Sequence, residues 1–424
     1  MDIPDGPFDR RGQVKQGYFW GFSEEAFQIL TRHPQIPWPL EVPLERPSER
    51  SSTSSMAMES NGSYGHEPFD LRKAQEQIRQ MGYDISDDDL LNVLLALETR
   101  PFVIFSGPSG TGKTTLIRII AELFGWTHYM VAVSPAWADP TDLLGFISPL
   151  SHQRVAGALD GLLRKKESYA LLCLDEFNVA KVEHYFSDFI SAMDGGADGS
   201  LWGPIPSLQR LSEEQHEELR LPASLRVVAT MNFDDSVQSI TPRVLDRANV
   251  MEFEVLSVDA LVMEESLDWT SLATTNAQWS WKERNNLMAP KVSEVIRGIW
   301  PVLHRSRGQF THRIAHEMHR YIMLGLPFAS DLDRDDDKQL EALLDRQIVQ
   351  RILPKFHGTT ASRDMDALIR VLSSLRGNAS DSVSGVDRLR VLSEFRNWGR
   401  FPKTIEKIEQ LLTSYTEDGY ASFW

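Results

Sequence analysis

The chain has 424 residues, of which 42% are apolar and 25% charged, and its formal net charge is −16 at pH 7. This length and composition are those of a globular protein with two or three domains and buried cores. The negative charge argues against a protein that coats nucleic acid by itself, although it leaves open a locally basic pore formed on assembly. No apolar run approaches the ~20 residues of a membrane helix. The acidic N-terminus lacks the basic segment followed by an apolar segment that is typical of a signal peptide. Cys173 is the single cysteine, so no intrachain disulfide can form, and we expect a cytoplasmic protein without a membrane partner.

The first part of the chain shows no pattern of a folded domain. Residues 1–39 carry scattered aromatic side chains and are treated as a short N-terminal segment whose role is open. Residues 40–66 are rich in Pro, Ser, Glu and Gly and are predicted to be a flexible linker. After the linker, Leu71–Met81 is predicted to be helical, and Ser86 with Asp89 resembles a capping box that starts a second helix.

The most informative segment follows the first predicted strand. Gly107, Gly112, Lys113 and Thr114 satisfy the pattern G-x-x-x-x-G-K-[ST], between an apolar run and an apolar-periodic helix. In such a loop, glycines let backbone N–H groups approach phosphates, the lysine adds positive charge, and the threonine hydroxyl can bind Mg²⁺. We therefore predict that the chain binds a nucleoside triphosphate with Mg²⁺. The predicted contacts are Gly107, Pro108, Ser109, Gly110, Thr111, Gly112, Lys113, Thr114 and Thr115.

Five apolar runs are predicted to be strands, and helices or long loops separate them. This alternation is typical of a mostly parallel sheet covered on both faces, in which ligands bind at the carboxyl ends of the strands. We expect residues 67–257 to form this α/β nucleotide-binding domain. The predicted strands are Phe102–Ser106, His128–Val133, Tyr169–Leu174, Leu225–Thr230 and Val250–Val255.

Polar residues follow the third and fourth predicted strands. Asp175 is predicted to bind Mg²⁺ together with Thr114, and Glu176 is predicted to activate water as a general base. Asn232, at the end of the fourth strand, is predicted to contact the γ-phosphate and the attacking water. Asn178 has two interpretations: it orients the base or contacts a neighbouring subunit, or it caps the helix that follows.

Two arginines precede the fifth predicted strand. Thr241 is a plausible N-cap and Pro242 a natural first helical residue, so Arg243 and Arg247 are expected one turn apart on one helix face. They could reach a phosphate in an adjacent subunit as arginine fingers. Alternatively, they form surface pairs with nearby acids such as Asp246. The position just before the strand favours the finger role for Arg247.

Residues 258–424 lack comparable strand patterns and are predicted to form a helical second domain. Arg313, near the start of one helix, either folds over the nucleotide or is an ordinary exposed arginine. His312, His316 and His319 lack a metal-binding spacing, and we predict no zinc site. The predicted helices are Val292–Val302, His312–Met323, Lys338–Ile352, Arg363–Leu375, Val386–Trp398 and Thr404–Tyr415.

These motifs together resemble the AAA+ superfamily, over about Pro68 to Trp424. Within it, the likeness is to McrB-type NTPases, the motor subunits of modification-dependent restriction systems. Thr230–Ser236 resembles their Met-Asn-x-x-Asp signature but departs from its longer form at Phe233 and Ser236. The other segments that carry the likeness are Thr99–Thr114, Trp137–Gly145, Leu174–Asp188, Ile352–Gly358 and Ala421–Trp424.

The resemblance implies an AAA+ P-loop NTPase with a five-stranded parallel sheet and a C-terminal helical lid. It also implies a ring, usually hexameric, with nucleotide at the subunit interfaces and the arginine finger supplied in trans. A separately encoded nuclease would be the partner, in defence against foreign DNA, and contact with DNA would be indirect or through the assembled pore. The DNA-recognising domain of many relatives is missing or reduced to residues 1–39, and the chain carries no evident nuclease signature. The choice between ATP and GTP stays open.

Two other functions compete with this interpretation. A MoxR-like remodelling chaperone would use the same motor on protein complexes, with Trp137, Phe146 and Trp202 either as substrate contacts or as core residues. A nucleotide-dependent assembly scaffold would bind nucleotide with little turnover. The presence of both Asp175 and Glu176 weighs against the scaffold.

Overall fold

A computed structural model describes residues 69–164, 169–193, 202–215, 221–222, 224–232, 238–253, 267, 269, 287–358, 362–377 and 388–424. The described residues all belong to one compact unit, Gly65–Trp424. The N-terminal segment 1–39 and the linker 40–66 predicted from sequence lie outside the described residues.

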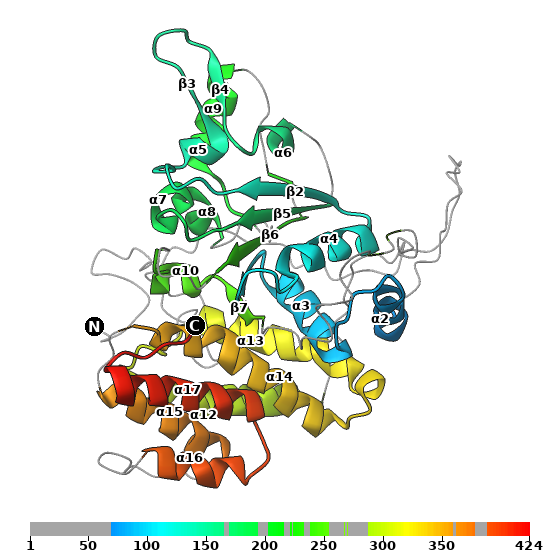
Figure 1. The fold of residues 1–424 in the computed structure, drawn as a ribbon, viewed down its shortest axis with the longest axis vertical. Helices are drawn as coiled ribbons and strands as arrows, with labels where there is room; N and C mark the ends of the chain where they lie inside the picture. The colour runs from blue at the N-terminus through cyan, green and yellow to red at the C-terminus, as the bar shows by residue number, and fades with distance from the viewer. Residues whose placement is uncertain are drawn as a thin grey trace, which may run out of the picture. The chain divides into compact units, whose positions relative to one another are not determined.

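A five-stranded parallel sheet, with the order β2-β5-β6-β1-β7, forms the centre of the α/β part (Figure 1). The strands are β1 Phe102–Ser106, β2 Thr127–Ala132, β5 Tyr169–Asp175, β6 Ser224–Met231 and β7 Asn249–Glu252. This confirms the predicted fold class and all five strands within one or two residues, except that residues 254–255 of the last prediction lie outside the described part. Strands β1, β5 and β6 are buried almost throughout, which explains their continuous apolar runs, whereas the edge strand β2 is partly exposed.

Helix α4 packs on strands β2, β5 and β6, and helix α3 packs on β1. Ser86 is the N-cap of α3, and its side chain accepts the Asp89 N–H at 3.1 Å, which confirms the predicted cap. The helices of this part are α2 Leu71–Gln80, α3 Asp87–Thr99, α4 Lys113–Phe124, α5 Thr141–Leu144, α6 Asp160–Arg164, α7 Val182–Tyr185, α8 Ser187–Ala192, α9 Pro206–Gln215 and α10 Pro242–Leu245.

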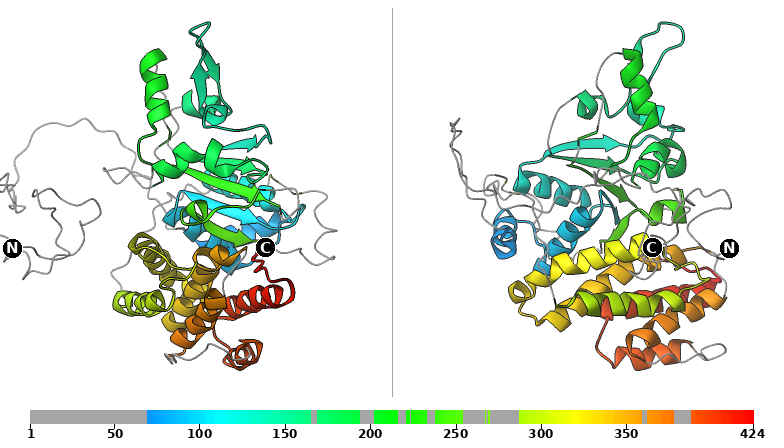
Figure 2. Two further views of the ribbon diagram at one scale, coloured as in Figure 1. Left: turned by 90° about the vertical axis from the view of Figure 1, so that its left-hand side faces the viewer. Right: turned by 180° about the vertical axis from the view of Figure 1, so that it is seen from behind.

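A β-hairpin that the sequence did not predict extends beyond the sheet in all three ribbon views (Figure 1, Figure 2). It consists of β3 Gly145–Ile147 and β4 Arg154–Ala156, paired antiparallel. Gly145 has φ +84°, and a Cβ there would lie 2.3 Å from the Val155 carbonyl oxygen, so the pairing requires glycine. Strands of three residues are too short for an alternation to be recognised, which is why the hairpin was missed.

The C-terminal part is helical, as predicted, and includes short 3₁₀ helices that were not predicted. Its elements are α12 Ala289–Val302, α13 His312–Gly325, η2 Leu326–Phe328, η3 Ser330–Leu332, α14 Asp336–Arg351, η4 Leu353–Phe356, α15 Ser362–Leu375, α16 Arg388–Arg396 and α17 Pro402–Asp418. This part joins the α/β part mainly where α13 packs on α3 and where α14 packs on β7. Buried hydrogen bonds reinforce the joint, because Asn92 of α3 accepts from Tyr321 at 2.5 Å and from Gln350 at 2.6 Å.

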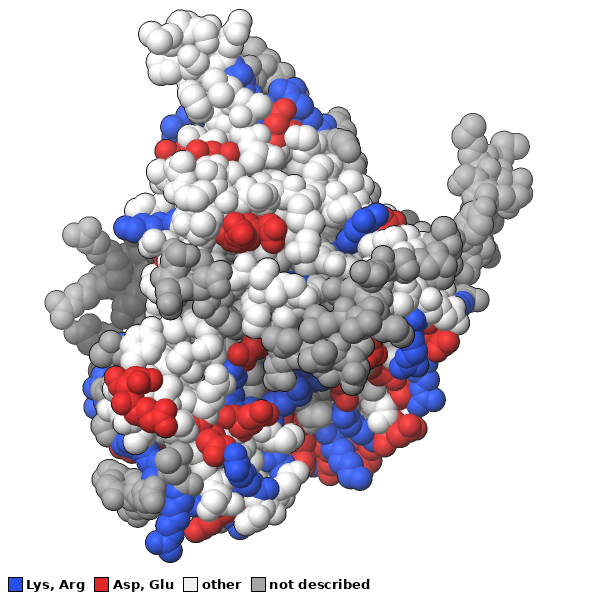
Figure 3. Space-filling view, viewed as in Figure 1, with Lys and Arg blue, Asp and Glu red and all other residues white. Residues whose placement is uncertain are grey.

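The face seen in Figure 1 carries most of its charged side chains over the helical part, with both signs mixed (Figure 3). None of the helices in the described ranges is long and apolar enough to cross a membrane.

The C-terminal tail is held against the helical part around His357. The Phe423 N–H donates to His357 Nδ1 at 3.3 Å, the Tyr420 hydroxyl lies 3.0 Å from Nε2, and Gly358 pairs with Ala421. Nδ1 can accept only when it carries no proton, so the contact requires neutral histidine. Burial, with a smaller contribution from Arg307, lowers the pKa of His357 to about 4.

This pKa predicts a loss of stability in acid. The unfolded chain binds a proton on His357 near its ordinary pKa of ~6.5, whereas the folded chain binds it only near the lowered value. The free energy of unfolding should therefore decrease as pH falls from ~6.5 towards ~4.

We expect the melting temperature of His357→Gln to depend less on pH between 7 and 5 than that of wild type. His316→Gln, at an exposed position of α13, is the matched control and should keep the wild-type slope. Equal slopes for wild type and His357→Gln would contradict this assignment.

Candidate functional site

The loop between β1 and α4 has the backbone geometry of a phosphate cradle. Gly107, Gly110 and Gly112 all have positive φ. A Cβ on Gly107 would lie 2.2 Å from the Phe253 carbonyl oxygen, so no other residue fits there. Gly112 is the N-cap of α4 in the left-handed conformation, and its carbonyl accepts from the Tyr83 hydroxyl at 3.3 Å. The loop therefore ends at the positive end of a three-turn helix, where anions bind.

Lys113 concentrates positive charge on the inner side of this loop. Its ammonium donates to the carbonyls of Gly107 at 2.9 Å and Pro108 at 2.6 Å, and to the Thr111 hydroxyl at 3.3 Å. The side chain is buried, while Ser109 and Gly110 at the crest of the loop are exposed. Thr114 and Thr115 are the next residues of α4 and are half-buried. The predicted phosphate-binding residues therefore lie in one continuous cradle.

The sheet register brings the other predicted residues to the same edge. Strand β6 lies between β1 and β5, and the Gly107 N–H donates to the Met231 carbonyl at 3.3 Å. Asn232 follows Met231 directly and is half-buried. On the other side of β6, Asp175 ends β5. The carboxyl ends of β1, β6 and β5 thus present the loop, Asn232 and Asp175 side by side.

Thr230 organises the acidic turn, and sequence analysis did not identify it as a site residue. Its hydroxyl donates to Asp175 Oδ1 at 2.5 Å and accepts the Glu176 N–H at 3.2 Å. Its carbonyl accepts the Phe177 N–H at 2.8 Å. These bonds hold Glu176 at φ +55°, an uncommon conformation for a residue other than glycine, with its side chain exposed. The available signal was the position of Thr230, two residues before Asn232 on the neighbouring strand.

The thiol of Cys173, buried in β5 two residues before Asp175, takes no part in this chemistry. Burial, with a smaller contribution from Asp175, raises the pKa of Cys173 to about 12. The side chain is fully buried and free of any disulfide. At neutral pH it is therefore a protonated, apolar filler of the sheet core, as the sequence indicated.

The oxygen donors at this edge fit Mg²⁺. Thr114 supplies a hydroxyl and Asp175 a carboxylate, and hydroxyl and carboxylate oxygens are the hard ligands that Mg²⁺ prefers. The carboxylate is oriented by Thr230, as carboxylates around metals generally are by a hydrogen-bonded neighbour. Thr114 and Asp175 are the residues that would hold the ion.

Removing the Thr230 hydroxyl should weaken the response to Mg²⁺. Thr230→Val keeps the shape and the strand preference but leaves Asp175 unsupported, and the expected loss of apparent Mg²⁺ affinity is ~10- to 100-fold. Thr230→Ser keeps the hydroxyl and serves as the matched control. The measurement is the rate of nucleotide hydrolysis as a function of Mg²⁺ concentration, with melting temperature as a check on folding. An unchanged Mg²⁺ titration for Thr230→Val would show that the hydroxyl has no such role.

Asn178 is not the cap that sequence analysis considered. The following helix, α7, has Lys181 as its N-cap residue, and no side chain caps it. Asn178 is instead 2% exposed, and its carbonyl accepts the Gln238 N–H at 2.8 Å. Among the described residues, nothing hydrogen-bonds to its side-chain Oδ1.

The predicted arrangement of the two arginines before β7 is wrong in part. Helix α10 begins at Pro242 as expected but ends at Leu245, so Arg247 lies in the turn after it and shares no helix face with Arg243. The Arg247 side chain turns back and donates to the Arg243 carbonyl at 3.0 Å. Arg243 is exposed, and Arg247 is half-buried. Thr241 is the N-cap residue, but its side chain makes no capping bond.

Arg247 lies at the opposite edge of the sheet from the phosphate cradle. Strands β1 and β7 are parallel, with Val103 opposite Asn249 and Ser106 opposite Glu252. Arg247 precedes this paired stretch and Gly107 follows it, so about six residues of strand, on the order of 15–20 Å, separate them. An arginine side chain cannot span that distance. Arg313 of α13 lies 3.8 Å from Glu317 on the same helix.

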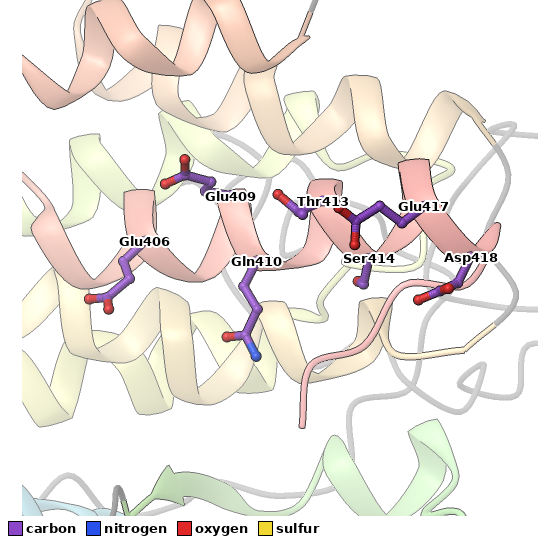
Figure 4. A pocket seen from close by; sticks show the side chains of 7 residues that line it. All are labelled: Glu406, Glu409, Gln410, Thr413, Ser414, Glu417 and Asp418. Atoms are coloured by element: carbon purple, nitrogen blue, oxygen red, sulfur yellow. The ribbon is translucent and has the colours of Figure 1, made fainter.

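Other candidate features do not extend this site. A shallow groove of about 400 Å³ on α17 is lined mostly by acidic and amide side chains (Figure 4). In the part of the chain that the structure describes, no three His, Cys, Asp or Glu side chains are grouped to hold a metal ion. His312 stacks on Trp300, and His319 Nε2 lies 3.4 Å from the Ala289 carbonyl.

The match of one family model agrees with this geometry. Residues 102–248 match the family model described as the AAA domain of the dynein-related subfamily, and residues 263–420 match a model described as a domain of unknown function, DUF8727. A solved structure described as a "putative ATPase" from Cytophaga hutchinsonii ATCC 33406 is similar at 13% identity, over 67% of this chain and 88% of that chain, with a TM-score of 0.42. No curated protein gave a match. Residues 102–248 are therefore similar to AAA domains, and the parallel sheet with its helical C-terminal part fits the AAA+ fold.

Proposed function

We propose that the protein hydrolyses a nucleoside triphosphate, ATP or GTP, at a site shared between neighbouring copies of the chain. The observation that carries this proposal is the separation of Arg247 from the cradle of its own chain. The phosphate loop, Asp175 and Glu176 lie together at the end of the sheet where the parallel strands finish. Arg247 lies at the opposite end, where the strands begin. Stabilisation of phosphate charge by Arg247 would therefore have to occur in trans, in a head-to-tail ring.

Each residue has a defined part in this reaction. The loop from Gly107 to Thr115 binds the phosphates, and Asn232 contacts the γ-phosphate and the attacking water. Glu176 accepts a proton from that water. Mg²⁺ bound by Thr114 and Asp175 would offset the charge of the phosphate oxygens. Arg247 of the neighbouring copy, assisted by Arg243, would stabilise the charge that develops on the transferred group.

The test measures assembly and hydrolysis together. The mass of the purified chain is determined with and without nucleotide, and hydrolysis of ATP and GTP is compared over a dilution series. A shared site predicts nucleotide-dependent assembly and a specific activity that decreases on dilution, because monomers lack the trans arginine. Lys113→Ala should lose binding, assembly and hydrolysis together. A monomer with full activity would overturn the proposal.

We further propose that the ring drives or licenses a separately encoded nuclease in defence against foreign DNA. The support is the likeness of six segments to McrB-type NTPases, among them Leu174–Asp188 and Ile352–Gly358. Addition of a nuclease encoded next to the gene, together with DNA, should stimulate hydrolysis and give DNA cleavage that stops in Glu176→Gln. Cleavage without nucleotide hydrolysis would contradict this role.

One observation favours a second function, remodelling of protein complexes as in MoxR-like chaperones. The hairpin β3–β4 exposes apolar side chains, with Phe146 at 41%, Val155 at 43% and, in the turn, Leu150 at 95% exposure. Trp202, in contrast, is buried and donates to the Leu225 carbonyl, so it is a core residue, and Trp137 is half-buried against Tyr185. Absence of a nuclease gene beside this one, with hydrolysis stimulated by a protein complex but not by DNA, would select this function.

A further inference from the structure

A buried arginine of the helical part binds the main chain on both sides of Arg247. Arg351, the last residue of α14, is 2% exposed. Its guanidinium donates to the carbonyl of Ala248 and, at 3.2 Å, to the carbonyl of Asp246. The Asp246 carbonyl belongs to the peptide that leads into Arg247, and the Ala248 carbonyl belongs to the peptide one residue after it, so the two bonds hold the main chain before and after Arg247.

A second cation of the helical part binds the same segment. Lys355 of η4 lies 2.5 Å from Asp246 Oδ1 and also donates to the Gln309 carbonyl at 3.2 Å. It is 3% exposed. Two side chains that are four residues apart in sequence therefore hold the turn 246–248 through its carbonyls and its carboxylate.

Glu317 of α13 connects this pair to the edge of the sheet. Its carboxylate lies 2.5 Å from Arg351 and 3.2 Å from Arg100, the residue two positions before β1. Arg313 is 3.8 Å away on the same helix. The network therefore ties the turn, two helices and the amino edge of the sheet together.

Packing alone does not require such a network. Taking charged groups out of water is costly, and apolar side chains of similar volume often hold buried surfaces as well or better. Directed hydrogen bonds to main-chain carbonyls add what apolar contact cannot, a defined orientation of the bound peptides. We propose that Arg351, with Glu317 and Lys355, is a positioning residue for Arg247, and that the helical part thereby aims the arginine that acts on the neighbouring copy. This inference rests on the shared site proposed above.

The test uses mixed assemblies, because a defect in aiming affects only the neighbour's site. Arg351→Gln should lower hydrolysis by ~10²-fold, the order expected when a catalytic group is misplaced by about 1 Å, while fluorescent-nucleotide affinity stays near wild type. Mixing it 1:1 with Glu176→Gln should restore about a quarter of the wild-type rate, because one site in four then combines an intact base with an intact arginine from its neighbour. Arg247→Ala mixed with Glu176→Gln is run in parallel.

Two further variants guard against a simple loss of folding. Lys355→Met leaves the Arg351–Glu317 pair in place and should give a smaller loss with the same recovery on mixing. Arg346→Gln is the matched control, because Arg346 also lies on α14 and is largely buried, but pairs with Asp89 of α3 at 2.9 Å. Its melting temperature should fall while its hydrolysis rate stays near wild type.

The outcomes separate the two proposals. Recovery in both mixtures supports the positioning role. If hydrolysis recovers when Glu176→Gln is mixed with Arg247→Ala, but not when it is mixed with Arg351→Gln or with Lys355→Met, the positioning role is overturned and the shared site stands. Recovery in no mixture overturns the shared site, and the positioning role falls with it. Wild-type hydrolysis by Arg351→Gln alone also overturns the positioning role.

Discussion

Arg247→Ala is expected to lower the rate of nucleoside triphosphate hydrolysis by about 10³- to 10⁵-fold, the range known for arginine fingers. The cause is the loss of a charge at the neighbour's phosphate, so each copy should still bind nucleotide in its own cradle. Steady-state hydrolysis and fluorescent-nucleotide binding, measured on the same preparation, separate the two effects. A large loss of affinity with little change in turnover would contradict the assignment.

Two comparisons sharpen this experiment. Arg243→Ala removes the exposed guanidinium of Arg243 and keeps the main-chain carbonyl that accepts from Arg247, so a smaller loss than for Arg247→Ala would identify Arg247 as the finger. Arg396→Ala is a control for charge alone, because Arg396 is an exposed residue of α16 paired with Glu409. Its rate should equal that of wild type.

Glu176→Gln is expected to lower turnover by about 10²- to 10⁴-fold, the usual contribution of a general base. The amide keeps the size of the side chain but cannot accept the proton of the attacking water. The turn is held by main-chain bonds to Thr230, which the substitution leaves in place, so the fold and nucleotide binding should persist. The variant should therefore assemble with nucleotide and retain it unhydrolysed, which single-turnover assays and mass measurements can detect.

The control for this variant is Glu183→Gln, a nearby carboxylate on α7 outside the site. It should hydrolyse nucleotide like wild type. If Glu176→Gln also hydrolysed nucleotide at the wild-type rate, the general base would have to be another group. The scaffold function is tested separately, by measuring the turnover of the wild-type protein.

The sequence alone determined the parts of this protein that depend on contiguous residues. The loop from Gly107 to Thr114 owes its shape to glycines with positive φ and to the helix that starts at its end, and both are local properties. The buried strands were predictable because a strand covered on both faces must be apolar throughout. Ser86 caps α3 through a bond to a residue three positions away. Asp175, Glu176 and Asn232 followed from their positions at strand ends.

Only the tertiary structure decided the remaining features, because they depend on contacts between distant parts of the chain. Thr230 reaches Asp175 across 55 positions, and Arg351 reaches Ala248 across 103, so no local pattern marks either side chain. From the sequence alone, Arg351 is predicted to be an ordinary positively charged residue at the end of a helix, although in the structure it is almost fully buried. The end of α10 before Arg247 could not be predicted either, because the helix propensities of the residues that follow allow the helix to continue. The strand register, which no single strand encodes, put Arg247 and the cradle at opposite edges of the sheet.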